Sequence, residues 1–136
     1  MRDIKIAEIM TTDITTVRDD MTVADAVVTL ADAHVMGVPV LDAKSRFVGV
    51  LSTTDVLEAA SEADDAAARE ALFAKTLVKD IMTPRPKTIA PDDSVKDAAQ
   101  QMLYLEVHRL FVEYDGELAG VISQSDIVRA VATATI

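Results

Sequence analysis

The chain has 136 residues, no cysteine and a formal net charge of -10, with 23 acidic against 13 basic side chains. This charge argues against a nucleic acid or an anionic membrane as partner, because both bind basic surfaces. The absence of cysteine excludes disulfide bonds and thiolate metal sites. We expect a cytoplasmic protein, because no apolar run reaches the length of a membrane span and the N-terminus lacks a signal-peptide pattern.

Acidic residues are spread along the chain, most of them are Asp, and Lys is scarce while Ala is abundant. This composition favours a halophilic source, because high salt screens the repulsion among surface carboxylates. An ordinary acidic surface is the alternative. In either case, an anionic ligand has to be held by a local basic cluster against the acidic background.

The N-terminal part of the chain predicts a unit of alternating strands and helices. An extended piece at residues 14–17 comes first. Apolar side chains then recur at i, i+3, i+4 and i+7 from Val23 onward, which predicts an amphipathic helix. Two β-rich runs at 38–41 and 47–51 are separated by a turn and indicate a hairpin. A second helix is expected from Thr53, so the unit is β-α-β-β-α.

The same pattern returns 72 residues later in the chain. Ile-Met-Thr at residues 9–11 recurs at 81–83, and the helical stretch 23–26 corresponds to 95–98. After residue 44 the spacing falls to 71, because one residue is lost where the hairpin turn is expected. Turns tolerate such losses. The chain is therefore two copies of one unit.

The segment between the copies, residues 61–77, is rich in Ala, Asp and Glu and contains neither Gly nor Pro. Such residues favour helix. We predict a first repeat at 1–60, an acidic helical linker at 61–77 and a second repeat at 78–136. The fold class is α+β. Each three-stranded sheet hides one face under its helices, so the repeats should pack sheet to sheet about a pseudo-twofold axis. That leaves two related clefts, where small ligands usually bind.

The tetrad Ser-x-x-Asp follows the last strand of each copy, at residues 52–55 and 123–126. One interpretation is a helix-capping box, a pattern that residues 22–25 and 94–97 fit as well. The other is ligand binding. Only the tetrads at 52–55 and 123–126 follow a buried strand. Free N–H groups at a helix start attract phosphate, and a carboxylate there can accept both hydroxyls of a ribose.

His108 and Arg109 form a basic pair at the start of a strand in the second copy. Arg offers a planar fork of donors that fits phosphate oxygens, and the pair stands out in so acidic a chain. A charged pair at a strand edge is the alternative. The first copy has Met36-Gly37 at these positions, so the second cleft should be the better equipped. His34 lies near a predicted helix end and is interpreted as structural.

Several of these features together resemble a known family. They are the Ile-Met-Thr segment at the start of each copy, the Thr-Val and Thr-Ile strands, the Gly-Val-Pro-Val hairpin start and the repeated Gly-h-h-Ser-x-x-Asp ending, where h is apolar. They look like a tandem pair of cystathionine-β-synthase (CBS) domains, a Bateman module, and cover nearly the whole chain. The second copy is most similar to nucleotide-binding repeats of the AMP-activated kinase γ subunit. The resemblance implies a stand-alone CBS protein that forms homodimers and binds AMP, ADP, ATP or S-adenosylmethionine.

The resemblance also implies which residues touch an adenine nucleotide. The backbone of the strands at 16–17 and 88–89 would read the adenine edge, while Val17, Ile89 and Pro39 sandwich the ring. Arg85 and Lys87 add positive charge to the cleft or are solvated surface residues. The stronger site is expected in the second repeat, from Thr88, Ile89, His108, Arg109, Ser123, Ser125, Asp126, Arg85 and Lys87. The weaker site is expected in the first repeat, from Thr16, Val17, Pro39, Ser52, Thr54 and Asp55.

The main functional prediction is a regulatory module that binds AMP, ADP or ATP in the cleft between the repeats, needs no cofactor and signals to an effector protein through altered packing. The alternatives are a dimer-forming interaction module without a physiological nucleotide ligand, and a binder of S-adenosylmethionine or NAD. We do not expect an enzyme or a metal site. Two histidines without a cysteine, a glycine-rich loop or metal-ligand spacing form no recognisable catalytic set.

Overall fold

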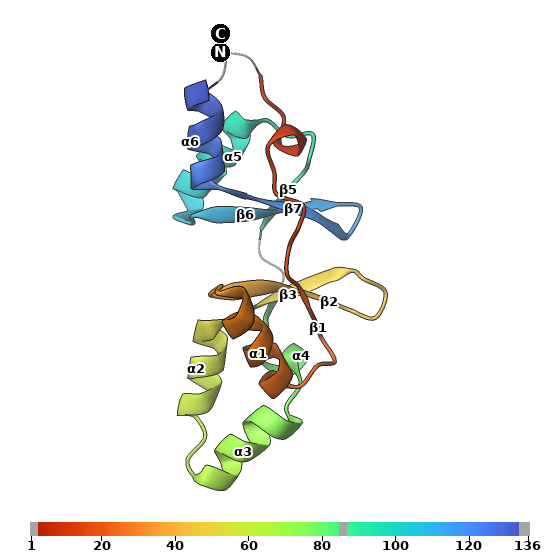
Figure 1. The fold of residues 1–136 in the computed structure, drawn as a ribbon, viewed down its shortest axis with the longest axis vertical. Coiled ribbons are helices and arrows are strands. Elements are labelled where there is room, and N and C mark those ends of the chain that lie inside the picture. Colours follow the sequence, from red (N-terminus) through yellow and green to blue (C-terminus); the bar gives the residue numbers. More distant parts are fainter. Residues whose placement is uncertain (1–2, 85–86, 134–136) are drawn as a thin grey trace. The chain divides into compact units, whose positions relative to one another are not determined.

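A computed structural model describes residues 3–84 and 87–133 of the chain. The chain folds into two compact units. One is formed by Thr15–Pro86, and the other by Met1–Ile14 together with Lys87–Ile136. In each unit, helices lie on one face of a small β-sheet (Figure 1). The predicted α+β class is confirmed. No helix within the described ranges is both long and apolar enough to span a membrane.

The unit of residues 15–86 is built on a sheet in the order β1-β2-β3-β4. β1 runs parallel to β2, whereas the other two pairings are antiparallel. Leu72 is buried and anchors the helix predicted in the linker against its neighbours. The elements are β1 (Val17–Arg18), α1 (Val23–Ala33), β2 (Gly37–Leu41), β3 (Phe47–Ser52), α2 (Thr53–Ser61), α3 (Ala66–Lys75), α4 (Val78–Ile81) and β4 (Thr83–Pro84).

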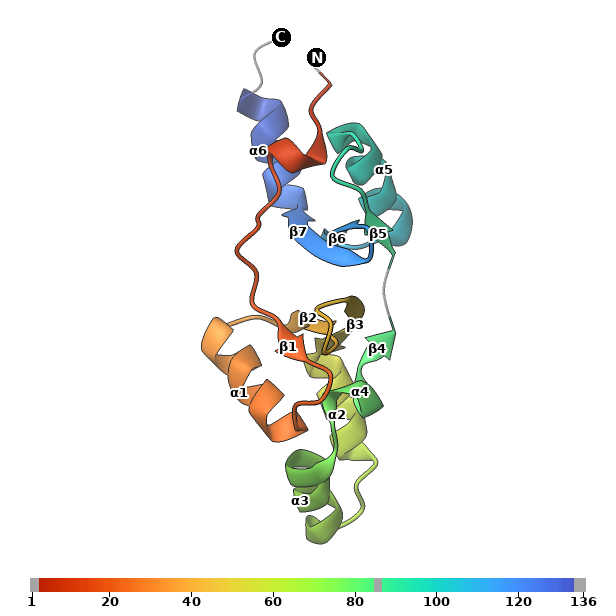
Figure 2. The same ribbon diagram turned by 90° about the vertical axis from the view of Figure 1, so that its right-hand side faces the viewer.

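The other unit contains a sheet in the order β5-β6-β7, with β5 parallel to β6 and β6 antiparallel to β7. A short 3-10 helix from the start of the chain, η1, lies beside α5 and α6 (Figure 2). The order β-α-β-β-α predicted for each repeat is confirmed in both units. The elements are η1 (Ile6–Glu8), β5 (Thr88–Ile89), α5 (Val95–Leu105), β6 (Arg109–Tyr114), β7 (Glu117–Ser123) and α6 (Gln124–Thr133).

The first long helix of each repeat begins and ends in the same way. The hydroxyl oxygens of Thr22 and Ser94 accept the N–H groups of Asp25 at 3.2 Å and Asp97 at 3.1 Å. These bonds satisfy N–H groups that have no partner inside the helix. Both helices end on a left-handed residue, which in α1 is His34 at φ 55°. The predicted place of His34 near a helix end is therefore confirmed, and its backbone terminates α1.

The two lead segments, residues 4–11 and 76–83, each belong to the unit built from the other repeat. Ile6 is fully buried in the core beneath α5 and α6, and Val78 is fully buried in the core of the other unit. Thr11 and Val121 exchange two backbone hydrogen bonds of 2.9 Å, much as β4 pairs with β3. Each compact unit therefore combines the body of one repeat with the lead segment of the other.

Gly49 and Gly120 make this exchange sterically possible. A Cβ atom at Gly120 would lie 2.8 Å from the sulfur of Met10 and 2.8 Å from the carbonyl oxygen of Thr11. Gly49 has the same relation to Met82, at 2.7 Å. Such distances leave no room for a side-chain carbon. The glycine of each Gly-h-h-Ser-x-x-Asp ending and the methionine of each Ile-Met-Thr lead thus recur together because they touch.

The two hairpin turns differ in length, as expected from the lost residue. In the longer turn, Oδ1 of Asp42 accepts the N–H groups of Arg46 at 2.9 Å and Lys44 at 2.8 Å. The bond from Arg46 has the largest effect, and together the two bonds hold the pKa of the Asp42 carboxyl below its ordinary value. The shorter turn uses positive φ angles at Asp115 and Gly116, as tight hairpin turns require. Both turns lie away from the Ser-x-x-Asp tetrads.

Candidate functional site

The β6–β7 hairpin brings the basic pair and the Ser-x-x-Asp tetrad of the second repeat to one end of the sheet. Arg109 is the register partner of Ser123 across the two antiparallel strands. The N–H of Gln124 donates to the carbonyl oxygen of His108 at 2.9 Å, so α6 begins beside this pair. The structure therefore places His108 and Arg109 next to residues 123–126.

Asp126 forms the capping box that the sequence suggested, but only one of its two carboxylate oxygens takes part in that box. Its Oδ2 accepts the N–H of Ser123 at 2.9 Å, and its own N–H donates to Oγ of Ser123 at 3.1 Å. Its Oδ1 lies 3.4 Å from Nη1 of Arg129. The carboxylate is held in place by the cap and still presents an acceptor outside it. Ser125 is exposed in the same helical turn.

The Arg109 side chain is exposed at the start of β6, with its guanidinium carbon 5.3 Å from the centre of the Phe111 ring. Phe111 itself is only 6% exposed. A ring fixed in this way attracts the cation and limits its motion. The Phe111 ring thus holds the guanidinium of Arg109, with its planar set of donors, near the start of α6. The same arrangement is absent from the first repeat by sequence, because Met36 and Gly37 occupy the equivalent positions.

The two residues of β5 differ in exposure, since Thr88 is half-buried and Ile89 is buried. Thr88 and Ile89 pair with Phe111 and Val112, and β5 is an edge strand of its sheet. Ile89 is 3% exposed and lies in the core cluster, as Val17 does in the other unit. That these two side chains sandwich an adenine ring stays a prediction.

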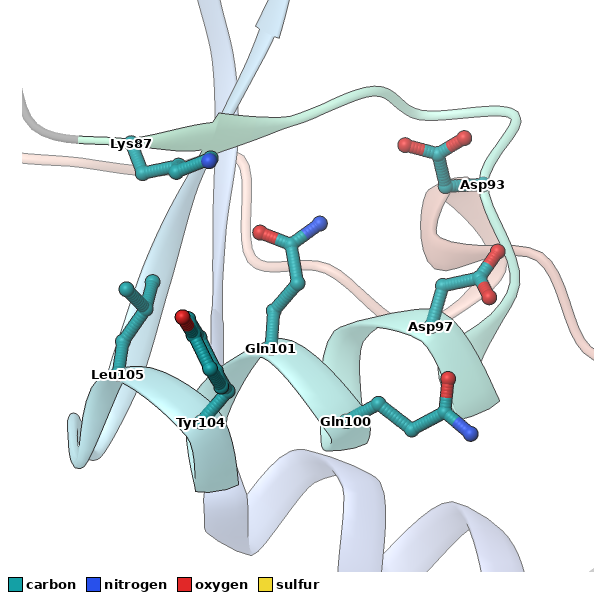
Figure 3. Close-up of a pocket in the computed structure, with 7 residues that line it drawn as sticks. All are labelled: Lys87, Asp93, Asp97, Gln100, Gln101, Tyr104 and Leu105. Carbon is teal, nitrogen blue, oxygen red and sulfur yellow. The ribbon is translucent and has the colours of Figure 1, made fainter.

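Lys87 directly precedes β5, whose Thr88 pairs with Phe111, two residues after Arg109 in β6. It lines a cavity of about 470 Å³ between β5 and α5, and Figure 3 shows its side chain above Gln101. Arg85 lies outside the described residues. The cavity is lined by Lys87, Asp93, Asp97, Gln100, Gln101, Tyr104 and Leu105.

The first repeat has the same capping geometry with a different partner. Asp55 bonds to Ser52 as Asp126 does to Ser123, with distances of 2.9 and 3.1 Å. Its Oδ1, however, accepts the hydroxyl of Thr83 at 2.9 Å. The N–H of Thr53 donates to the carbonyl oxygen of Met36 at 2.8 Å. Since Met36 and Gly37 stand where the second repeat has His108 and Arg109, this helix start has no basic pair beside it.

The remaining candidates of the first repeat are spread over three elements. Thr16 is half-buried just before β1, and Thr54 is exposed in the first turn of α2. Pro39 is buried in β2 between two core valines, so it points to the opposite sheet face. The structure brings Ser52, Thr54 and Asp55 together at one helix start.

Two residues at these sites were missed by sequence reasoning. The sequence shows Thr83 only as part of a repeated Ile-Met-Thr segment, yet its hydroxyl bonds to Asp55. No local motif marks Arg129. The repeat spacing of 71 makes it equivalent to Glu58, and this reversal of charge between the copies is the signal that points to Arg129.

Comparison with known proteins identifies the family of this chain. The CBS domain family model matches residues 6–62 and 78–133. The chain is 30% identical to the chloroplastic CBS domain-containing protein CBSX1 of Arabidopsis thaliana over 92% of its own length, and it spans 63% of that relative.

Solved structures share the fold. A structure of CBSX2 in complex with AMP superposes with a TM-score of 0.76 at 28% identity, covering 95% of this chain and 97% of that one. The CBS domain pair of protein MJ0100, in complex with 5-methylthioadenosine and S-adenosyl-L-methionine, gives a TM-score of 0.73 at 19% identity over 96% of this chain and 98% of that one. With both repeats matched by the family model, this chain belongs to the CBS domain family and carries a tandem CBS pair.

Proposed function

We propose that this protein is a regulatory module that binds an adenine nucleotide of the AMP, ADP or ATP class at the second repeat. The observation that carries the proposal is the register of the β6–β7 hairpin. It sets an exposed arginine beside a helix start whose carboxylate is held in place and only partly buried. The effector protein would sense the packing change expected from the sequence. We propose no catalytic role.

Each part of a nucleotide has a matching group at this site. The Asp126 carboxylate can accept the ribose hydroxyls, because the cap uses only part of its acceptor capacity. Arg109 and His108 can take the phosphate. Ser125 lies in the first turn of α6, where an N–H has no partner inside the helix and favours an anion. The edge strand β5 offers backbone groups to the base.

The relatives support this class of ligand and keep a second one open. CBSX2, which binds AMP in its solved structure, is similar to this chain over nearly its whole length. S-adenosylmethionine and NAD also carry a ribose that Asp126 can hold. Arg109 favours the nucleotides, since its guanidinium fits a phosphate and S-adenosylmethionine has none.

Thermal unfolding with AMP, ADP, ATP, S-adenosylmethionine and NAD, at low and high salt, tests the proposal. A ligand at about 100 times its Kd should add roughly 2.7 kcal/mol to the free energy of unfolding. We expect a phosphate-bearing ligand to do so. If none of the five raises the melting temperature, the dimer-forming interaction module is favoured instead. The same series tests the halophilic proposal, which expects the ligand-free protein to gain stability with salt.

Arg109→Ala is expected to weaken AMP binding by roughly tenfold to a hundredfold, because a charge-assisted hydrogen bond is worth about 1.5–3 kcal/mol. Adenosine, which has no phosphate, should bind the variant and the wild type equally well. Isothermal titration with both ligands measures this difference. Arg18→Ala, which removes an exposed arginine of β1 in the other unit, is the matched control. An equal loss for adenosine would show that Arg109 has no phosphate role.

We also propose that two chains associate through their helices. Large apolar side chains are exposed on α2 and α6 at equivalent repeat positions, Leu57 at 70% and Val128 at 67%. An exposed apolar face of this kind marks an interaction surface. Replacing both residues with glutamate should shift the protein to a monomer in sedimentation velocity, with its unfolding temperature little changed. A wild-type monomer at high concentration would contradict the proposal.

A further inference from the structure

We infer that Arg129 is a specificity residue of the second-repeat site: it holds the Asp126 carboxylate in the free protein and exchanges it for the phosphate of a bound nucleotide. The inference rests on the proposed function and adds to it. Arg129, which has no basic equivalent in the first repeat, makes this site favour nucleoside phosphates over the nucleoside itself.

The first support is the position of the contact. Nη1 of Arg129 lies 3.4 Å from Oδ1 of Asp126, the oxygen that is not engaged by Ser123. The two ends of the pair differ in exposure: the arginine side chain is 70% exposed and the aspartate side chain 17%. The arginine can therefore leave at little cost, whereas the carboxylate is anchored by the helix cap.

The second support is the comparison between repeats. Glu58 stands where the second repeat has Arg129, and in the first repeat the hydroxyl of Thr83 bonds the equivalent oxygen at 2.9 Å. The fold therefore does not need a cation at this place to form the same capping box. The cation is found in the repeat that also has the basic pair His108 and Arg109.

The consequence depends on the charge of the ligand. The hydroxyls of adenosine have to compete with Arg129 for Asp126, and adenosine offers the displaced guanidinium nothing in return. AMP brings a phosphate to the same helix start, and a guanidinium binds phosphate through paired, charge-assisted hydrogen bonds. Arg129 reaches back along α6 toward its first turn, because its partner Asp126 lies three residues before it. Releasing Asp126 therefore leaves the guanidinium near the α6 start that we propose for phosphate.

Arg129→Ala tests the inference by isothermal titration with AMP and with adenosine. Adenosine should bind about two- to fivefold more tightly, because an exposed ion pair no longer competes. AMP should bind roughly tenfold less tightly, because one charge-assisted contact is lost. Arg129→Lys should retain part of the preference for AMP, and Arg129→Glu, which copies the first repeat, should lower AMP affinity further. Arg69→Ala, at a position in α3 of the other unit, is the matched control and should change neither affinity.

The outcomes separate this inference from the proposed function. If the wild type binds neither ligand, the proposed function fails and this inference fails with it. If the wild type binds AMP and Arg129→Ala leaves the ratio of AMP to adenosine affinity unchanged, the inference alone is overturned. A purely structural role of the ion pair would lower the melting temperature and shift both affinities in the same direction, which also contradicts it.

Discussion

Asp126→Asn is expected to weaken AMP binding by roughly tenfold to a hundredfold, and Asp126→Ala by more. A carboxylate can accept both ribose hydroxyls, whereas an amide accepts through one oxygen and loses the charge. Each hydrogen bond to a charged group is worth about 1.5–3 kcal/mol. Asparagine keeps an acceptor for the N–H of Ser123, so α6 stays capped and the change reports on the ligand. Isothermal titration with AMP measures the loss.

Asp97→Asn is the matched control for this prediction. Asp97 is also the last residue of a capping tetrad, but it lies in the first turn of α5, where its N–H bonds to Ser94. The variant should bind AMP as the wild type does. Should it weaken binding as much as Asp126→Asn, the choice of the tetrad at 123–126 is wrong. Asp55→Asn should have a small effect, because Thr83 already bonds this carboxylate and no basic pair accompanies it.

Ile6→Ala is expected to destabilise the unit that contains the second repeat, although Ile6 belongs to the first repeat by sequence. Its side chain is fully buried in the core beneath α5 and α6. Truncating such a side chain costs about 2–5 kcal/mol, because it leaves a cavity as well as removing apolar contact. Hydrogen exchange should show faster exchange in residues 87–133 and unchanged protection in residues 17–61.

Val78→Ala is the reciprocal variant, because Val78 follows Ile6 by one repeat spacing and is equally buried. It should loosen the unit of residues 15–84 by roughly 2 kcal/mol and leave α5 and α6 protected. If Ile6→Ala instead exposes α1 and α2, the lead segments are not exchanged between the repeats.

Much of the fold could be predicted because its signals are local. The apolar spacing after Val23, the hairpins and the capping residues Thr22 and Ser94 each depend on neighbouring residues, and all are confirmed. The meeting of Arg109 with Ser123 could also be predicted. One residue starts a strand and the other ends the strand paired with it, so a tight hairpin must bring them together.

The features of the fold and of the site that could not be predicted depend on contacts between segments that are distant in sequence. Nothing near the Ile-Met-Thr segments indicates that each packs on the other repeat, because the partner glycine lies more than 30 residues away in sequence for Met82 and further still for Met10. The bond from Thr83 to Asp55 depends on the same exchange. Ile89 could not be assigned to the core or to a ligand, because a two-residue strand has no periodicity that fixes its face.

Amide NMR spectra during a titration with AMP test the central claim most directly. This chain of 14.6 kDa is suited to the method. We predict that the largest shifts fall on residues 108–109 and 123–126, with Ser125 among them, and that residues 52–55 move little or only at higher AMP concentration. Shifts confined to 52–55, or no shifts at saturating AMP, would contradict the account of the second repeat as the nucleotide site.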